Sequence, residues 1–195
     1  MIKDIFKTSI YHINVFNETY KNYFVSILDK CIKEKKEVFK SNIGGFQTPT
    51  FTLDSYGNEL EKKLINDLIV NPCGTFLKQF KIKKPFQLNN LYYWINKNFK
   101  GSSNKPHSHG HNYISGIYYL QTPKNSGDLV FLDINKLNND NFKFFEDPNF
   151  FSEFTISPKE YDLILFFSET IHYVQPNNSD QDRISMAFNI NISEL

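Results

Sequence analysis

Four of the five histidines in this 195-residue chain fall in two places, and their spacing is typical of a metal site. His107 and His109 form a His-x-His pair just before an apolar segment, and His172 lies far downstream. Residues i and i+2 of an extended strand point to the same face, so both imidazoles of the pair can reach one ion. A third imidazole from a neighbouring strand would complete a facial set with open coordination positions, as non-haem Fe(II) oxygenases require.

Arg183 and Ser185 follow the distal histidine and form a candidate site for a carboxylate. The guanidinium of arginine is a planar fork of donors that matches the two oxygens of a carboxylate. A hydroxyl two residues further along a strand shares its face and can add a hydrogen bond to the same group. The alternative is a surface ion pair of Arg183 with Asp180 or Asp182. We favour carboxylate binding, because Arg183 leads a row of small and polar residues.

The other histidines and the two cysteines suit different roles. His111 lies in a turn flanked by Gly and Asn, so we expect it to contact a metal ligand or the substrate and not to bind the metal. His12 is isolated and is expected to be structural. Cys31 lies on an apolar helix face, which predicts a small core residue. With Cys73 as the only other thiol, neither a disulfide framework nor a zinc site is expected.

Helices are predicted first along the chain, and strands after them. An apolar stripe from Tyr20 to Ile32, capped by Asn17, predicts one helix. A second helix follows Asn58 and is expected to end at Pro72, and residues 76–80 predict a short third one. Short segments rich in aromatic and β-branched residues then predict strands at 87–96, 113–121, 128–133, 161–167 and 183–192. This order is typical of a β sandwich or barrel supported by helices.

The last predicted strand has two different faces. From Arg183 to Asn191 the odd positions are small or polar, whereas the even positions from Ile184 to Ile192 are apolar. We expect the polar face to line the interior of a jelly roll and the apolar face to pack on the N-terminal helices. The chain is then one mainly β domain, with an arm and supporting helices in residues 1–85 and the β core in residues 86–195.

Composition limits the partners that can be expected. The net charge is +1 and basic residues form no stripe, so nucleic acid is not a predicted partner. Leader and membrane-spanning patterns are not evident, which favours a cytoplasmic protein, in the host cytoplasm if the gene is viral. The substrate is expected to be a small molecule or a peptidyl residue, selected by residues 134–156 and 44–51. The oligomeric state stays open, and a homodimer is possible.

Three segments resemble a family of 2-oxoglutarate/Fe(II) oxygenases found in phages and marine bacteria, within the prolyl-hydroxylase-like superfamily. They are PHSHGHNYISGIYYLQTP, SGDLVFLD and YDLILFFSETIHYVQPNNSDQDRISMAFNI. The resemblance extends from about residue 40 to the end. It implies a double-stranded β-helix that uses Fe(II), 2-oxoglutarate and O2. The implied activity is a dioxygenase that hydroxylates an unidentified substrate and releases succinate and CO2.

The resemblance also implies roles for particular residues. His107 and His172 would be iron ligands, and Arg183 with Ser185 would bind the C5 carboxylate of 2-oxoglutarate. Three further residues could reach this co-substrate: Tyr93, Tyr118 and Asn189. The wider superfamily has Asp or Glu where this chain has His109. Either His109 is the third ligand, which we favour, or Asp128 or Asp133 replaces it.

Two alternatives compete with this interpretation. A cupin-type metal enzyme that does not use 2-oxoglutarate would fit the spacing of GSSNKPHSH, but the glutamate that cupins place after this pair is missing. Arg183 would also have no role in such an enzyme. A non-catalytic binding module on the same fold is the second alternative, because a fold does not dictate function.

Overall fold

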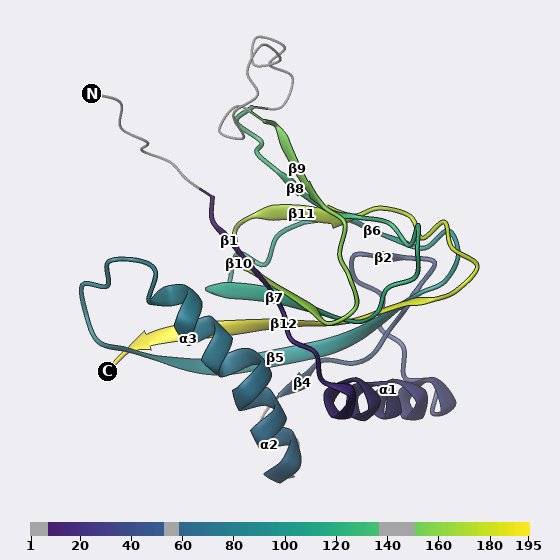
Figure 1. Cartoon of the computed structure of the whole chain (residues 1–195), viewed down its shortest axis with the longest axis horizontal. Helices are drawn as coiled ribbons and strands as arrows, with labels where there is room; N and C mark the ends of the chain where they lie inside the picture. The colour runs from purple at the N-terminus through teal and green to yellow at the C-terminus, as the bar shows by residue number, and fades with distance from the viewer. Residues whose placement is uncertain (1–7, 53–58, 137–150) are drawn as a thin grey trace.

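Two antiparallel sheets face each other, and helices cover the outer face of the larger one (Figure 1). This computed structural model describes residues 8–52, 59–136 and 151–195. The larger sheet has the order β1-β10-β7-β12-β5-β3, with β4 also paired to β5. Its strands are β1 (Ile10–Asn14), β3 (Phe46–Gln47), β4 (Phe51–Thr52), β5 (Phe86–Asn98), β7 (Ile114–Gln121), β10 (Asp162–Phe167) and β12 (Arg183–Glu194).

The smaller sheet has the order β2-β6-β11-β8-β9. Its strands are β2 (Asn42–Ile43), β6 (Ser103–His107), β8 (Leu129–Leu132), β9 (Glu153–Ile156) and β11 (Ile171–Val174). From β5 to β8, and again from β10 to β12, consecutive strands alternate between the two sheets. This alternation is the winding of a double-stranded β-helix, and it confirms the predicted fold class.

The first helix, α1 (Glu18–Lys33), begins where the sequence predicts. The side chain of Asn17 accepts a hydrogen bond from the backbone N–H of Tyr20 at 3.1 Å, which satisfies one of the unpaired donors of the first turn. The helix buries Phe24, Leu28 and Cys31 against the larger sheet. The expectation that Cys31 is a core residue is therefore confirmed.

The second helical segment does not end at Pro72, so that prediction was wrong. α2 (Glu59–Ile65) continues through one π-helical turn, η2 (Asn66–Val70), into α3 (Asn71–Leu77). Pro72 lies at the start of α3, directly after the π-helical turn, so the break that a proline imposes on the regular hydrogen-bond pattern falls at the junction of the two segments.

Apolar side chains pack in two layers. The larger cluster lies between the helices and the larger sheet and contains Ile184, Met186, Phe188 and Ile190, the even positions of β12. The smaller cluster lies between the two sheets and joins residues of β7, β8 and β10: Ile117, Tyr119, Leu129, Phe131, Ile164 and Phe166. The predicted apolar face of β12 does pack on the helices, which leaves its other face for the space between the sheets.

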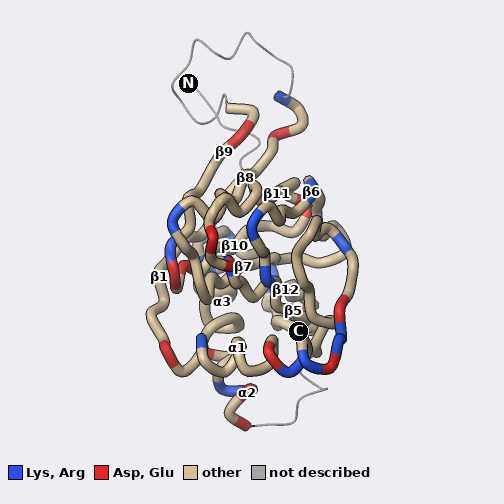
Figure 2. Tube along the Cα trace, turned by 90° about the vertical axis from the view of Figure 1, so that its right-hand side faces the viewer, with Lys and Arg blue, Asp and Glu red and all other residues tan. Residues whose placement is uncertain are grey.

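The hairpin of β8 and β9 projects from the smaller sheet (Figure 1). Most of the predicted substrate loop 134–156 lies outside the described residues, and only its two ends belong to the described structure. Figure 2 shows basic and acidic residues interspersed over the described elements. Among these elements, no helix is both long and apolar enough to cross a membrane.

Candidate functional site

A cavity of about 620 Å³ lies between the two sheets. The first three odd positions of β12, Arg183, Ser185 and Ala187, line it together with residues of β5 and β7, as the pattern of the last strand predicts. Residues of the smaller sheet and of the segment before β2 complete the wall. The lining side chains used below are Lys40, Gln47, Trp94, Asn96, Lys105, His107, His109, Tyr119, His172, Arg183 and Ser185.

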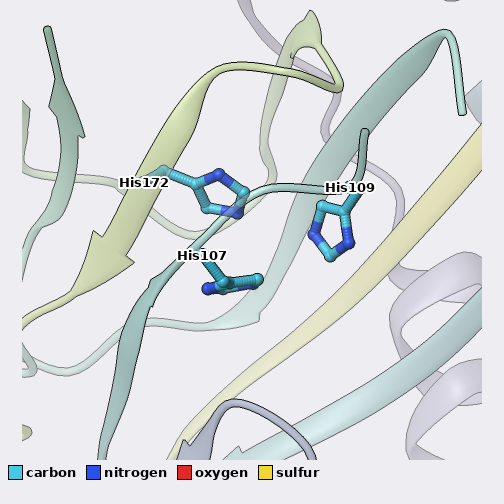
Figure 3. Close-up of side chains that lie close together, drawn as sticks. All are labelled: His107, His109 and His172. Atoms are coloured by element: carbon cyan, nitrogen blue, oxygen red, sulfur yellow. The ribbon is translucent and has the colours of Figure 1, made fainter. Parts of the chain in front are cut away.

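The structure brings His107, His109 and His172 together (Figure 3). His107 ends β6 and is the direct register partner of His172 on β11, which explains how residues so far apart in sequence meet. The backbone N–H of His109 donates to the carbonyl of Ser168 at 2.7 Å, which holds the chain after β6 beside the β10–β11 turn. One ligand atom of each imidazole lies within 4.8 Å of the other two, close enough to bind one metal ion.

Hydrogen bonds and burial prepare these imidazoles for a metal. The ring Nδ1 of His107 donates to the carbonyl of Lys105 at 2.7 Å, and that of His172 donates to the carbonyl of Thr170 at 3.0 Å. A carbonyl can only accept, so Nε2 of each ring keeps its lone pair. Burial, reinforced by His107, lowers the pKa of His109 to about 4 and that of His172 to about 3. Burial also lowers the pKa of His107, so the neutral ligand forms prevail at pH 7.

No carboxylate joins this cluster within the described part of the chain. Asp133, one of the two acids considered from the sequence, pairs with Lys136 at 2.8 Å. Asp128 belongs to neither the histidine cluster nor the cavity lining. His111 is exposed in the turn that follows β6 and is also outside the cluster. His109 is therefore the candidate for the third ligand.

Arg183 lies inside the molecule with 1% of its surface exposed. Its Nη1 donates to the carbonyls of Ser126, Gly127 and Gln175, so three backbone acceptors fix one edge of the guanidinium. Its Nη2 is buried without a hydrogen-bond partner. Burial lowers the pKa of this group, yet an arginine remains charged in proteins. The surface ion pair considered from the sequence does not form, because Lys97 and Lys100 pair with the neighbouring aspartates.

A glycine makes this arrangement possible. Gly127 has a φ of +88°, and a Cβ atom there would lie 2.4 Å from the carbonyl oxygen of Gln175. Any larger residue would push apart the two segments whose carbonyls hold Arg183. Gly127 therefore positions the arginine without touching the cavity itself.

The structure places a tyrosine in the cavity that the sequence analysis missed. Tyr119 is directly opposite Ser185 in the register of β7 and β12, and its hydroxyl is buried without a partner. Burial raises its pKa, so the hydroxyl stays protonated and can donate. The parity of β7 could have indicated this residue, because a strand that buries Tyr118 on one side must present Tyr119 on the other.

Three of the five residues expected to reach a co-substrate do not line the cavity. Tyr93 lies on the helix side of β5 and donates to Glu61, and Tyr118 lies on the helix side of β7 and donates to the carbonyl of Val15 at 2.7 Å. Asn189 accepts from the hydroxyl of Ser115 at 2.7 Å and is outside the lining. The two tyrosines have the opposite strand parity to Arg183 and Ser185, whereas Asn189 shares that parity but bonds Ser115 outside the lining.

A family model described as "Putative 2OG-Fe(II) oxygenase" matches residues 92–189, half of the chain. The chain belongs to this family. By the description of this family the chain is an oxygenase that depends on Fe(II) and 2-oxoglutarate, which decides against the cupin-type and non-catalytic alternatives. No curated protein sequence matches the chain.

Solved structures of similar shape support the fold of this oxygenase. A prolyl-4-hydroxylase from Pseudomonas putida is 12% identical with a TM-score of 0.63, and the match covers 94% of this chain and 92% of that one. The viral collagen prolyl hydroxylase of Paramecium Bursaria Chlorella virus-1, in a 2-oxoglutarate complex, is 16% identical with a TM-score of 0.58, covering 93% and 94%. HygX from Streptomyces hygroscopicus, with nickel and 2-oxoglutarate bound, is 15% identical with a TM-score of 0.62, covering 94% and 83%.

The residues present fit both cofactors of the family. Three neutral imidazoles provide nitrogen ligands that suit iron. Two of the buried groups without partners that line the cavity, Nη2 of Arg183 and the hydroxyl of Tyr119, are hydrogen-bond donors. A carboxylate offers only acceptors, so it satisfies the groups that the protein leaves unpaired.

Proposed function

We propose that this oxygenase hydroxylates a C–H bond of its substrate and converts 2-oxoglutarate to succinate and CO2. His107, His109 and His172 would hold the iron, and Arg183, Ser185 and Tyr119 would bind the far carboxylate of 2-oxoglutarate. One observation carries this proposal: two buried donors without partners, on Arg183 and Tyr119, line the same cavity as the three imidazoles. Burying a donor without a partner costs free energy, so these two donors favour a ligand that supplies the missing acceptors.

When bound, Fe(II) with 2-oxoglutarate supplies the activation of O2, which no side chain of the protein can provide. The contribution of the chain is to place the reactants. Arg183 is held at one edge by carbonyls, so little side-chain freedom is lost when its other edge binds a carboxylate. The hydroxyl of Ser185 adds a donor from the next cavity-facing position of β12. Together they orient the co-substrate with respect to the histidines.

Aromatic rings pack beside the histidines. Phe166 of the apolar layer between the sheets packs against His172, with ring centroids 4.7 Å apart. The ring centroid of Phe131, in the same layer, lies 6.2 Å from that of His172. Trp94 lies on another side, with its ring centroid 5.7 Å from that of His109. These rings fix the imidazoles by packing and leave the substrate to approach from the open side of the cavity.

The proposal is tested by anaerobic titration of the Fe(II)-loaded protein with 2-oxoglutarate. The expected result is a visible metal-to-ligand charge-transfer band, followed by succinate formation when O2 is admitted. His172→Ala should lose the iron and the band. Arg183→Gln should keep the iron and need roughly ten- to hundred-fold more 2-oxoglutarate, because a hydrogen bond to a charged group contributes about 1.5–3 kcal/mol. Bound iron with neither band nor succinate would contradict the proposal.

A further inference from the structure

We infer that the substrate is a small molecule with an anionic group, a carboxylate or a phosphate, that Lys40 and Lys105 bind at the rim of the cavity. The inference rests on the proposed function, since it names the substrate class of the same site. Four observations carry it: the sign of the charges that line the cavity, the place of the two lysines, a buried amide without a partner, and the volume of the cavity.

All charged side chains that line the cavity within the described residues are basic: Lys40, Lys105 and Arg183. No Asp or Glu of the described residues lines it. Two lysines in and just after β5 have carboxylate partners instead, since Lys97 pairs with Asp182 at 3.1 Å and Lys100 with Asp180 at 2.6 Å. Among the described side chains, no carboxylate pairs with Lys40 or Lys105. The cavity therefore presents an uncompensated positive potential to its substrate.

Strand pairing places the two lysines together and close to the histidines. β2 pairs with β6, and the backbone N–H of Lys105 donates to the carbonyl of Ser41 at 2.9 Å, next to Lys40. The carbonyl of Lys105 accepts the hydrogen bond from Nδ1 of His107. One rim lysine is thus held by the same backbone that orients a candidate iron ligand.

Asn96 indicates that a second molecule enters beside 2-oxoglutarate. Its side chain lines the cavity, the residue is 8% exposed, and its carbonyl Oδ1 is buried without a partner. This atom needs a donor, whereas 2-oxoglutarate as a dianion offers only acceptors. In the sheet, Asn96 of β5 is opposite Ser185 of β12 on one side and Gln47 of β3 on the other. It therefore lies between the proposed co-substrate site and β3, the strand that follows Lys40 and β2 in the chain. A hydroxyl or amide of the substrate would satisfy it.

The size of the cavity favours a small molecule over a macromolecule. Its volume of about 620 Å³ falls within the range of roughly 300–1,000 Å³ that is usual for small-molecule sites. A five-carbon co-substrate fills only part of that space. The remaining volume adjoins the basic rim and the amide of Asn96, so the second ligand is expected to be polar and anionic.

The test is calorimetric titration of the full-length protein, saturated with Zn(II) and 2-oxoglutarate, with phenyl phosphate, benzoate and benzyl alcohol as probes. Both anions, or one of them, should bind at least ten-fold more tightly than the neutral alcohol, and their order tells whether phosphate or carboxylate is preferred. The double variant Lys40→Gln/Lys105→Gln should lose at least ten-fold in affinity for the preferred anion. The matched control Lys100→Gln, which removes an exposed lysine outside the cavity, should bind it as the wild type does.

Three results would overturn the inference: neither anion binds, the alcohol binds as tightly as the anions, or the double variant binds them unchanged. The affinity for 2-oxoglutarate is measured in the same variants and should not change. A ten-fold loss there would place the lysines in the co-substrate site and would also overturn it. Failure of the wild type to bind 2-oxoglutarate at all would instead contradict the proposed function, and the anion titrations on the unliganded protein would still decide on the rim lysines.

Discussion

Two adjacent tyrosines of β7 have opposite environments although both are almost fully buried. Tyr118 points toward the helices and donates its hydroxyl to the carbonyl of Val15, whereas Tyr119 points into the cavity and has an unpaired hydroxyl. Burial raises the pKa of both, so both are donors at neutral pH. Only Tyr119 can therefore contribute a hydrogen bond to a ligand between the sheets.

Tyr119→Phe should weaken 2-oxoglutarate binding roughly ten- to hundred-fold, because one hydrogen bond to a carboxylate is removed while the ring stays in place. The dissociation constant is measured by calorimetry with the Zn(II)-loaded protein. Tyr118→Phe is the matched control: it loses a bond to Val15 and should lower stability by about 1 kcal/mol without changing 2-oxoglutarate binding. Equal losses of affinity in both variants would show that Tyr119 has no direct contact with the co-substrate.

At the scale of elements, the central strands of the larger sheet meet at one glycine. Gly116 of β7 is the register partner of Phe188 on β12 and of Leu165 on β10. A Cβ atom at this position would lie 2.2 Å from Cζ of Phe188 and 2.7 Å from Cδ2 of Leu165. The absence of a side chain lets the phenylalanine fill the layer between sheet and helices, which keeps β7 and β12 in the register that places Tyr119 opposite Ser185.

Gly116→Ala should lower the free energy of unfolding by about 1–3 kcal/mol, as expected for overpacking of a filled core. Chemical denaturation measures this change, and Phe188→Leu in the same chain should restore part of it by removing the ring that clashes. Gly74→Ala is the control, because a Cβ atom there meets nothing within 4 Å and alanine favours the helix. That variant should be as stable as the wild type or slightly more so, and a loss of the same size would point to a general effect of replacing glycine.

At the scale of the whole molecule, burying three imidazoles makes stability depend on pH. The pKa values of His109 and His172 fall to about 4 and about 3 through burial, whereas a histidine in an unfolded chain titrates near about 6.5. Between these values the unfolded chain binds more protons than the folded one. The free energy of unfolding of the metal-free protein therefore decreases as the pH falls through this window and is fully retained above about pH 7.

Denaturation of the metal-free protein at pH 7.5, 6.5 and 5.5 should show this loss. His172→Gln should flatten the dependence, because the variant no longer buries one of the groups that must stay neutral. His12→Gln, which removes a half-exposed histidine paired with Asp162, controls for the loss of an imidazole elsewhere. A dependence that is the same in the wild type and in His172→Gln would mean that the buried histidines do not cause it.

The fold class and several candidate residues could be predicted from local sequence patterns. The alternation along β12 predicts which face packs on helices, and this was confirmed because a strand fixes side-chain direction residue by residue. The His-x-His spacing predicts two imidazoles on one side for the same reason. The end expected at Pro72 was wrong because a π-helical turn before the proline lets the helix continue, and the sequence does not show where such a turn forms.

The sequence by itself determined the residue types and their local directions: three histidines, an arginine followed by a serine, and a strand with two unlike faces. Only the tertiary structure decided which partners meet. The pairing of β6 with β11 brings His107 to His172, the glycine at 127 lets three carbonyls hold Arg183, and the register of β7 and β12 selects Tyr119 over Tyr118. Side-chain direction follows from a residue's own backbone, whereas register and burial depend on contacts between segments that are distant in sequence.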